Sequence, residues 1–220
     1  MDTKLTPDQV LLFQIFHPFA VDRTTLVDSN HIRFVHYTRA EAAMKILKSK
    51  QVWMRKSMCM NDYTEVLHGI RYLEDIFTSK LGDRFKFVLN GLFPDLAVKM
   101  ETMFVNSKLK LLTDTYITCV SEHNSGPEDA YGRLSMWRAY GGNSGVALVM
   151  NNAPFLASEP SDTLAIQASP VAYVGEDGFK EAFEQVVGNI ENDAEFLRKQ
   201  SQQTIEGYLF RMLAFAAVCA

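Results

Sequence analysis

A strand that turns directly into a helix is the feature that most limits how this chain can fold. Apolar and polar residues alternate from Ile32 to His36, which is the pattern of a half-buried β-strand. Thr38 then stands three residues before Glu41, the spacing of a capping box at a helix N-terminus. The segment predicts that His36, Tyr37 and Thr38 end a strand beside the positive end of a helix, where an anionic ligand binds favourably. The alternative is a purely structural strand end, in which Thr38 caps the helix while His36 and Tyr37 pack nearby.

Composition limits the class of protein. Hydrophobic residues make up 47% of the 220 residues and charged residues 22%, as in an ordinary soluble domain. The net charge of -4 disfavours a protein held to nucleic acid mainly by phosphate contacts, although a local basic patch stays open. Cys59, Cys119 and Cys219 lack paired spacing, which disfavours disulfides or a zinc site and favours a cytoplasmic location. Cys119 is interpreted as a small buried residue, and the N-terminus lacks a signal-peptide pattern.

The order of helix-like and strand-like patterns along the chain predicts a single α+β domain over residues 1–220, with a central mixed sheet flanked by helices. Residues 1–30 are expected to be helical, and residues 62–112 to form a helical insertion broken at Pro94. The continuous apolar run after Ser144 indicates a central strand. After the opening strand, the strands are predicted at residues 51–55, 115–122, 145–150 and 165–174.

The C-terminal segment is almost wholly apolar. The run from Tyr208 to Ala220 is shorter than the roughly 20 residues that a membrane helix needs. A core helix over 204–218 is therefore predicted, after another at 179–198, and no membrane interaction is expected. Because the chain stops inside the apolar run, the sequence looks interrupted there.

The predicted second strand and the segment after it carry candidate binding residues. Trp53 and Arg55 stand two apart and would share one face of that strand. Arg55 could contact a phosphate through its planar guanidinium, or remain a solvated charge at the strand end. Asn61 and Asp62 precede the next helix, where one is expected to cap the helix and the other to be available to a ligand.

Polar residues end the strand predicted at 115–122. A carboxylate at Glu122, beside Ser121, could stabilise a developing cation or act as a base, and a solvated acidic loop residue is the alternative. His68 and His123 have no companions at metal-ligand spacing, so neither is interpreted as a ligand and no metal site is predicted.

An aromatic pair precedes a Gly-Gly turn. Trp137 and Tyr140 stand three residues apart, on one face of a helical turn that Gly141 and Gly142 end. The two rings either belong to the core or form a stacking wall for an aromatic ligand.

Together these segments resemble a bacterial and archaeal family described as a domain of unknown function. The resemblance covers about residues 31–150 and depends on the order of its motifs rather than on any one of them. The matching motifs are His36-Tyr37-Thr38, Ile46-Leu47-Lys48-Ser49, Trp53, Met60-Asn61-Asp62, Glu65, Cys119-Val120-Ser121-Glu122, Met136-Trp137, Tyr140 and Gly145-Val146-Ala147-Leu148.

The first motif, with the helix and strand after it, is also similar to the first NAD-binding segment of ADP-ribosyltransferases, which include toxins that modify nucleic acids. The similarity implies a split-sheet fold with NAD as substrate, whose ribose would be held by His36 and Thr38. Tyr37, Trp137 or Tyr140 would pack against the nicotinamide ring.

The same similarity requires a carboxylate to stabilise an oxocarbenium-like transition state. The unknown-function family continues past a helix like 204–218 into a Glu-rich segment, the natural place for such a carboxylate, and this chain ends before it. Glu122 and Glu65 are the candidate substitutes.

The sequence therefore predicts an NAD-binding, ADP-ribosyltransferase-like protein, such as a toxin or phage-defence effector, with a protein or nucleic acid as acceptor. One alternative is a non-catalytic module that senses a nucleotide or a partner protein. The other is a metal-dependent nuclease or hydrolase that uses Asp62, Glu65 and Glu122.

Overall fold

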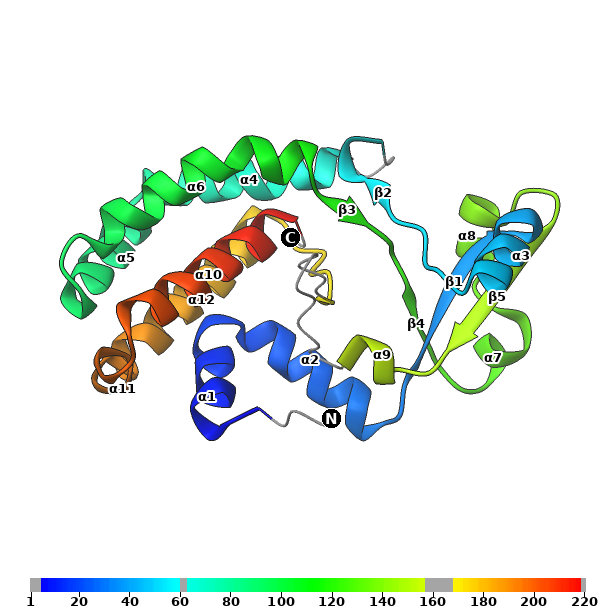
Figure 1. The fold of residues 1–220 in the computed structure, drawn as a ribbon, viewed down its shortest axis with the longest axis horizontal. Helices are drawn as coiled ribbons and strands as arrows, with labels where there is room; N and C mark the ends of the chain where they lie inside the picture. Colours follow the sequence, from blue (N-terminus) through cyan, green and yellow to red (C-terminus); the bar gives the residue numbers. More distant parts are fainter. Residues whose placement is uncertain (1–4, 60–62, 157–167, 219–220) are drawn as a thin grey trace. The chain divides into compact units, whose positions relative to one another are not determined.

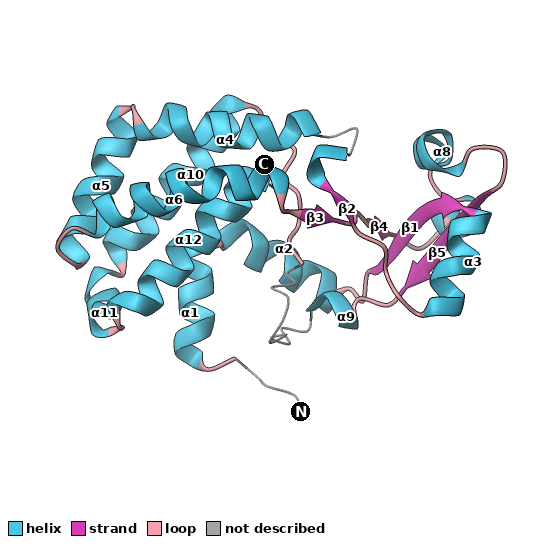
Figure 2. Ribbon diagram, turned by 45° about the horizontal axis from the view of Figure 1, so that its top comes forward, coloured by secondary structure: helices cyan, strands magenta, loops and turns pink. Residues whose placement is uncertain are grey.

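The computed structural model describes residues 5–59, 63–156 and 168–218, with only the backbone described for residues 63–66 and 156. It combines helices with small antiparallel sheets, and helix predominates (Figures 1 and 2). The fold is thus α+β. The chain divides into two compact units, where the sequence analysis expected one domain with an insertion. The larger unit comprises residues 1–22, 56–115 and 169–220, and the smaller comprises residues 23–55 and 116–168.

The larger unit is helical. Its first helix begins at a capping box, in which Gln9 donates its backbone N–H to Thr6 Oγ1 while its side chain accepts from the Thr6 backbone N–H. The predicted break at Pro94 falls between α5 and α6. Its elements are α1 (Pro7–Phe16), η1 (Ser57–Cys59), α4 (Tyr63–Phe77), α5 (Lys80–Leu92), α6 (Leu96–Thr113), α10 (Glu176–Asn192), α11 (Ala194–Lys199) and α12 (Gln202–Val218).

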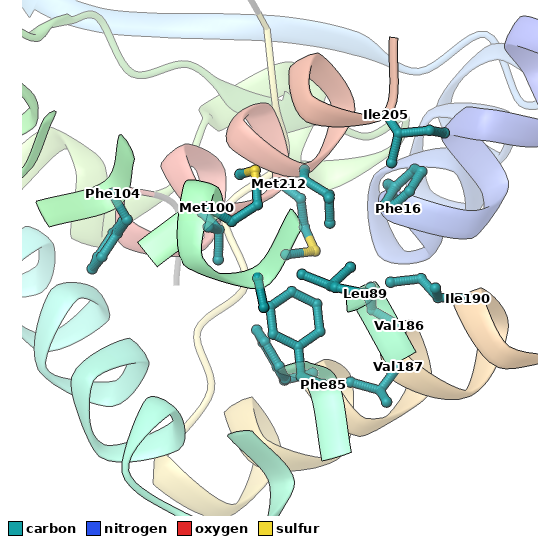
Figure 3. Close-up of a cluster of buried hydrophobic side chains, with 14 of the residues drawn as sticks. Phe16, Phe85, Leu89, Met100, Phe104, Val186, Val187, Ile190, Ile205 and Met212 are labelled. Atoms are coloured by element: carbon teal, nitrogen blue, oxygen red, sulfur yellow. The ribbon is translucent and has the colours of Figure 1, made fainter. Parts of the chain in front are cut away.

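A continuous apolar core holds these helices together. Every long helix of the unit contributes fully buried side chains to it, several of which are drawn in Figure 3. The core includes Phe16, Leu73, Phe85, Leu89, Met100, Phe104, Val187, Ile190, Ile205, Leu209 and Leu213. The predicted C-terminal core helix is confirmed, because α12 buries one side against this cluster. A Cβ on Gly69 of α4 would lie 2.6 Å from the Ala217 carbonyl oxygen, so the two backbones approach closely there.

The smaller unit is built on a three-stranded sheet. The strand order is β4-β1-β5, and both pairings are antiparallel. α2 (Pro18–Ser29) leads into this unit, and β2 (Arg55–Lys56) pairs with β3 (Tyr116–Ile117). The remaining elements are β1 (Arg33–Arg39), α3 (Ala40–Ser49), β4 (Ser121–His123), α7 (Pro127–Tyr131), α8 (Leu134–Met136), η2 (Trp137–Gly141), β5 (Gly145–Met150) and α9 (Ala153–Leu156).

The sheet corrects two expectations. It is antiparallel rather than mixed, and β1 rather than the 145–150 segment is its central strand in the part of the chain described. The apolar run of β5 had indicated burial on both faces. However, Val149 is exposed and the strand's other apolar residues are half-buried.

Three other predicted strands differ from the observed ones. The 115–122 segment splits into β3 and β4, and only Arg55 of the 51–55 segment lies in a strand. Residues 168–174 of the predicted 165–174 strand have no regular structure, and residues 165–167 lie outside the described part. Pro170 has no N–H to donate to a ladder, which opposes a strand there.

The predicted capping box at Thr38 and Glu41 is wrong. Thr38 stays in β1, because this strand pairs with β5 as far as Arg39 opposite Gly145. Arg39 is the N-cap of α3 and makes no side-chain cap, while the Glu41 carboxylate pairs with Lys45. Among the described residues, no helix combines the length and apolar character needed to cross a membrane.

Candidate functional site

Sheet register decides which predicted site residues share a face. Residues directly opposite in an antiparallel pair project to the same side, and residues two apart along a strand do too. Glu122 lies opposite Phe34, and β5 supplies the partners of His36 and Thr38. We call this side the His36 face; its residues are Phe34, His36, Thr38, Glu122, Val146, Leu148 and Met150.

The opposite side carries the other half of the predicted site. Ser121 of β4 lies opposite Val35 of β1, and Tyr37 stands two residues after Val35 along β1. We call this side the Tyr37 face; its residues are Arg33, Val35, Tyr37, Ser121, His123, Ala147 and Val149. The structure thus places the predicted ribose contacts on one face and the predicted ring contact Tyr37 on the other.

The His36 face is half-buried, and its polar groups are oriented. His36 Nδ1 lies 3.0 Å from the Cys119 carbonyl oxygen. Because a carbonyl only accepts, Nδ1 carries the proton and Nε2 is the acceptor of the neutral ring. Thr38 lies two residues further along β1, next to the start of α3. The face therefore offers an imidazole acceptor, a hydroxyl group and apolar β5 side chains.

Glu122 is held by an arginine. Arg23 Nε donates to Glu122 Oε1 over 2.7 Å, and Arg23 Nη2 donates to Glu122 Oε2. This forked contact raises the pKa of the Arg23 guanidinium, through the hydrogen bond first and the charge of Glu122 second. Both oxygens of the predicted catalytic carboxylate are consequently engaged.

Tyr37 and Trp137 form a packed aromatic pair. Their rings meet edge to face with centroids 4.9 Å apart, and Tyr37 is 3% exposed. The Tyr37 hydroxyl accepts from the Arg133 backbone N–H at 2.9 Å, and Trp137 Nε1 donates to the Tyr131 carbonyl at 2.8 Å. Gly132 lies against both side chains, where a Cβ would come within 2.7 Å of Trp137 Nε1. The geometry gives this pair a packing role.

The sheet pairing places none of the other described candidate residues on the His36 face. Trp53 and Tyr140 have exposed side chains, and Arg55 is also exposed at the start of β2. Cys119, interpreted as buried, is exposed, because the chain between β3 and β4 is not in a strand. Asn61 and Asp62 lie outside the described residues, and Glu65 is in α4 of the larger unit with its side chain outside them.

A polar cavity on the smaller unit was missed by the sequence analysis. Its volume is about 280 Å³, and it lies where α2 meets β1 and where β4 ends. Its lining residues are Asn30, His31, Ile32, Arg33, His123, Asn124 and Ser125. His123 had been set aside because no residue at a fixed spacing accompanied it. Its partners, Arg33 across the sheet and Asp129 in α7, are brought to it by the fold.

The described residues contain no group of three His, Cys, Asp or Glu side chains that could hold a metal ion. Comparison of the chain with models of known protein families, with curated proteins and with solved structures found no match in any of the three.

Proposed function

We propose that the smaller unit is a nucleotide-binding module that takes NAD, or a related dinucleotide, on the His36 face. The observation that carries this proposal is the register that puts His36, Thr38 and Glu122 on one half-buried side of β1 and β4. Ribose hydroxyls are donors and acceptors, and they match the His36 Nε2 acceptor and the Thr38 hydroxyl. Val146 and Leu148 supply apolar surface beside them.

The start of α3 supports an anionic ligand at the same place. Arg39 is the N-cap and makes no side-chain bond to the first turn, so the helix begins without a side-chain cap. The Ala40 N–H donates to the Ser144 carbonyl oxygen, so the support for a phosphate there comes from the remaining first-turn N–H groups and the positive end of the helix. Pyrophosphate beside the α3 start and ribose on His36 is the binding mode that we infer.

ADP-ribosyl transfer, to a protein or nucleic-acid acceptor, is the catalytic form of this proposal. Glu122 shares the His36 face, which is where an oxocarbenium-like sugar would need a carboxylate. Arg23 holds both of its oxygens, so the structure as it stands favours binding without turnover. Displacement of Arg23 by substrate or partner would be required before cleavage of the nicotinamide bond.

The test is calorimetric titration of the protein with NAD, together with an assay of nicotinamide release. His36→Ala should weaken NAD binding about tenfold or more, since it removes the inferred ribose acceptor. His68→Ala is the matched control, because His68 is an exposed histidine in the larger unit and should leave binding unchanged. Absence of NAD binding in the unaltered protein would overturn the proposal.

Turnover is tested separately with Arg23→Ala and Glu122→Gln. If Glu122 is the catalytic carboxylate, releasing it from Arg23 should raise nicotinamide release, and Glu122→Gln should abolish it. NAD binding with no release in any of these proteins would identify a non-catalytic sensing module.

A further inference from the structure

The cavity beside His123 has the chemistry of a site for a small phosphate. It is about 280 Å³ in volume, and six of its seven lining residues have polar side chains. Ligand pockets commonly measure about 300–1,000 Å³, so this cavity fits an ion or a small molecule rather than a dinucleotide. Arg33, His31 and His123 are the residues around it that can carry positive charge.

One carboxylate fixes the two central residues of the cavity. Asp129 Oδ1 accepts from Arg33 Nη2 at 2.7 Å and from His123 Nε2 at 3.0 Å. These contacts, His123 first and Arg33 second, hold the pKa of Asp129 below its usual range, so it stays ionised near neutral pH. Arg33 and His123 are also direct partners across β1 and β4. The pair is therefore positioned by the fold before any ligand arrives.

His123 has one ring nitrogen without a partner. The residue is 4% exposed, and its Nδ1 is buried with no hydrogen-bond partner among the described residues. Since Nε2 donates to Asp129, Nδ1 is the acceptor of the neutral ring. A buried unsatisfied acceptor costs about 1–3 kcal/mol. Because Nδ1 is covered, a ligand in the adjoining cavity recovers that free energy only once the side chains over this atom move aside.

We propose that this cavity binds phosphate, with Arg33 as the charged contact and His123 as the group that recognises the ligand's proton. Inorganic phosphate keeps a P–OH group near neutral pH and can donate to Nδ1, whereas sulfate has the same shape and no proton. The Arg33 guanidinium retains N–H groups beyond the one used by Asp129. Ser125 and Asn124 supply further polar groups at the exposed rim. This site is distinct from the His36 face and does not depend on NAD binding.

Titration calorimetry of the full chain in a phosphate-free buffer near neutral pH tests the proposal. We expect saturable binding of one inorganic phosphate with a dissociation constant of about 1 mM or tighter, and roughly tenfold weaker binding of sulfate. Ribose 5-phosphate forms a second arm, because tighter binding than inorganic phosphate would identify a phosphate monoester as the ligand. Absence of saturable phosphate binding overturns the proposal, and equal affinity for sulfate overturns the role given to His123.

Two variants locate the ligand. Arg33→Gln should weaken phosphate binding about tenfold or more, because it removes the guanidinium. It also breaks the contact with Asp129, so Ser125→Asp provides a second route that puts a carboxylate at the exposed rim and leaves the Arg33–Asp129 pair intact. Ser49→Asp, at an exposed serine of the same unit that lies at the C-terminal end of α3 and outside the cavity lining, is the matched control. Unchanged phosphate binding in Ser125→Asp would exclude the cavity.

A last comparison separates this site from the proposed nucleotide site. Phosphate binding should survive in His36→Ala, and NAD binding should survive in Ser125→Asp. Loss of phosphate binding in His36→Ala would assign the phosphate to the His36 face and overturn the assignment to the cavity.

Discussion

The two units of this protein are stabilised in different ways. The larger unit buries a continuous set of aliphatic and aromatic side chains from most of its helices. The smaller unit has a three-stranded sheet with few fully buried side chains, and ion pairs surround it: Arg23 with Glu122, Arg33 with Asp129, and Arg133 with Glu128. Exposed ion pairs contribute little to stability. We infer that the larger unit supplies most of the stability and the smaller unit the polar surface for ligands.

The chain provides separate reporters for this comparison. Both of its tryptophans, Trp53 and Trp137, lie in the smaller unit, so tryptophan fluorescence reports on that unit alone. The long helices lie in the larger unit, so circular dichroism at helical wavelengths reports chiefly on it. Midpoints that differ between the two signals would show that the units unfold separately.

The largest effect is expected from the apolar core. Phe85 is 1% exposed and packs edge to face on Phe183. Phe85→Ala should lower the free energy of unfolding of the larger unit by about 4 kcal/mol, since it leaves a cavity. Phe87→Ala is the control on the same helix, because Phe87 is 81% exposed. A shift in the dichroism midpoint no larger than that of the control would contradict this division of stability.

A comparable effect in the smaller unit is expected at a glycine. Gly132 has φ +67°, and a Cβ there would meet Trp137 and the Tyr37 hydroxyl. Gly132→Ala should cost about 3 kcal/mol, from backbone strain and the contact together. Gly126→Ala shares the positive φ but has open space around it, so it should cost about 2 kcal/mol. The fluorescence midpoint measures both, and equal shifts would show that the aromatic pair is not tightly packed.

Acid should weaken the larger unit through His17. Burial first, and the charge of Arg211 second, lower the pKa of His17 to about 4. The unfolded chain binds this proton near pH 6.5, so stability is full above that pH and falls as the pH drops toward 4. The loss approaches about 3 kcal/mol. His17→Phe removes the titrating group beside Phe13 and Phe215 and should flatten this dependence. The same slope in the variant would show that other groups cause it.

The smallest effect is expected at the ion pair that holds Glu122. The Glu122 side chain is 21% exposed and the Arg23 side chain is 41% exposed. Glu122→Gln should change the free energy of unfolding of the smaller unit by less than about 1 kcal/mol. A much larger fall in the fluorescence midpoint would mean that ion pairs, and not only packing, stabilise this unit.

Local patterns predicted the helices and the central strand better than they predicted the site. The periodicity of 62–112 and 204–218 and the alternation before His36 depend on near neighbours, and the structure has helices and a strand there. Whether a strand such as 145–150 lies at the centre or the edge of a sheet depends on which other strands pair with it. These pairings are not visible in the local sequence. The three residues His36, Tyr37 and Thr38 are adjacent in sequence, yet a strand sends its middle side chain to the opposite face.

The cavity residues escaped the sequence analysis for a related reason. Asp129 accepts hydrogen bonds from both Arg33 and His123, although Asp129 and Arg33 are 96 residues apart in the sequence. No local spacing marks such a cluster. His123 was set aside for lack of a companion at metal-ligand spacing, whereas its companions are assembled by the pairing of β1 with β4.

The way the chain divides between the units has a consequence for its synthesis. The strands of the smaller unit's sheet are complete once Met150 has been made, while the larger unit still lacks α10, α11 and α12. Helix α12 packs on α4 and α6, so these two helices emerge with apolar surface uncovered until α12 has been made. The sheet of the smaller unit can therefore form on the ribosome first, and the aggregation risk from the uncovered helices of the larger unit persists until α12 has been made.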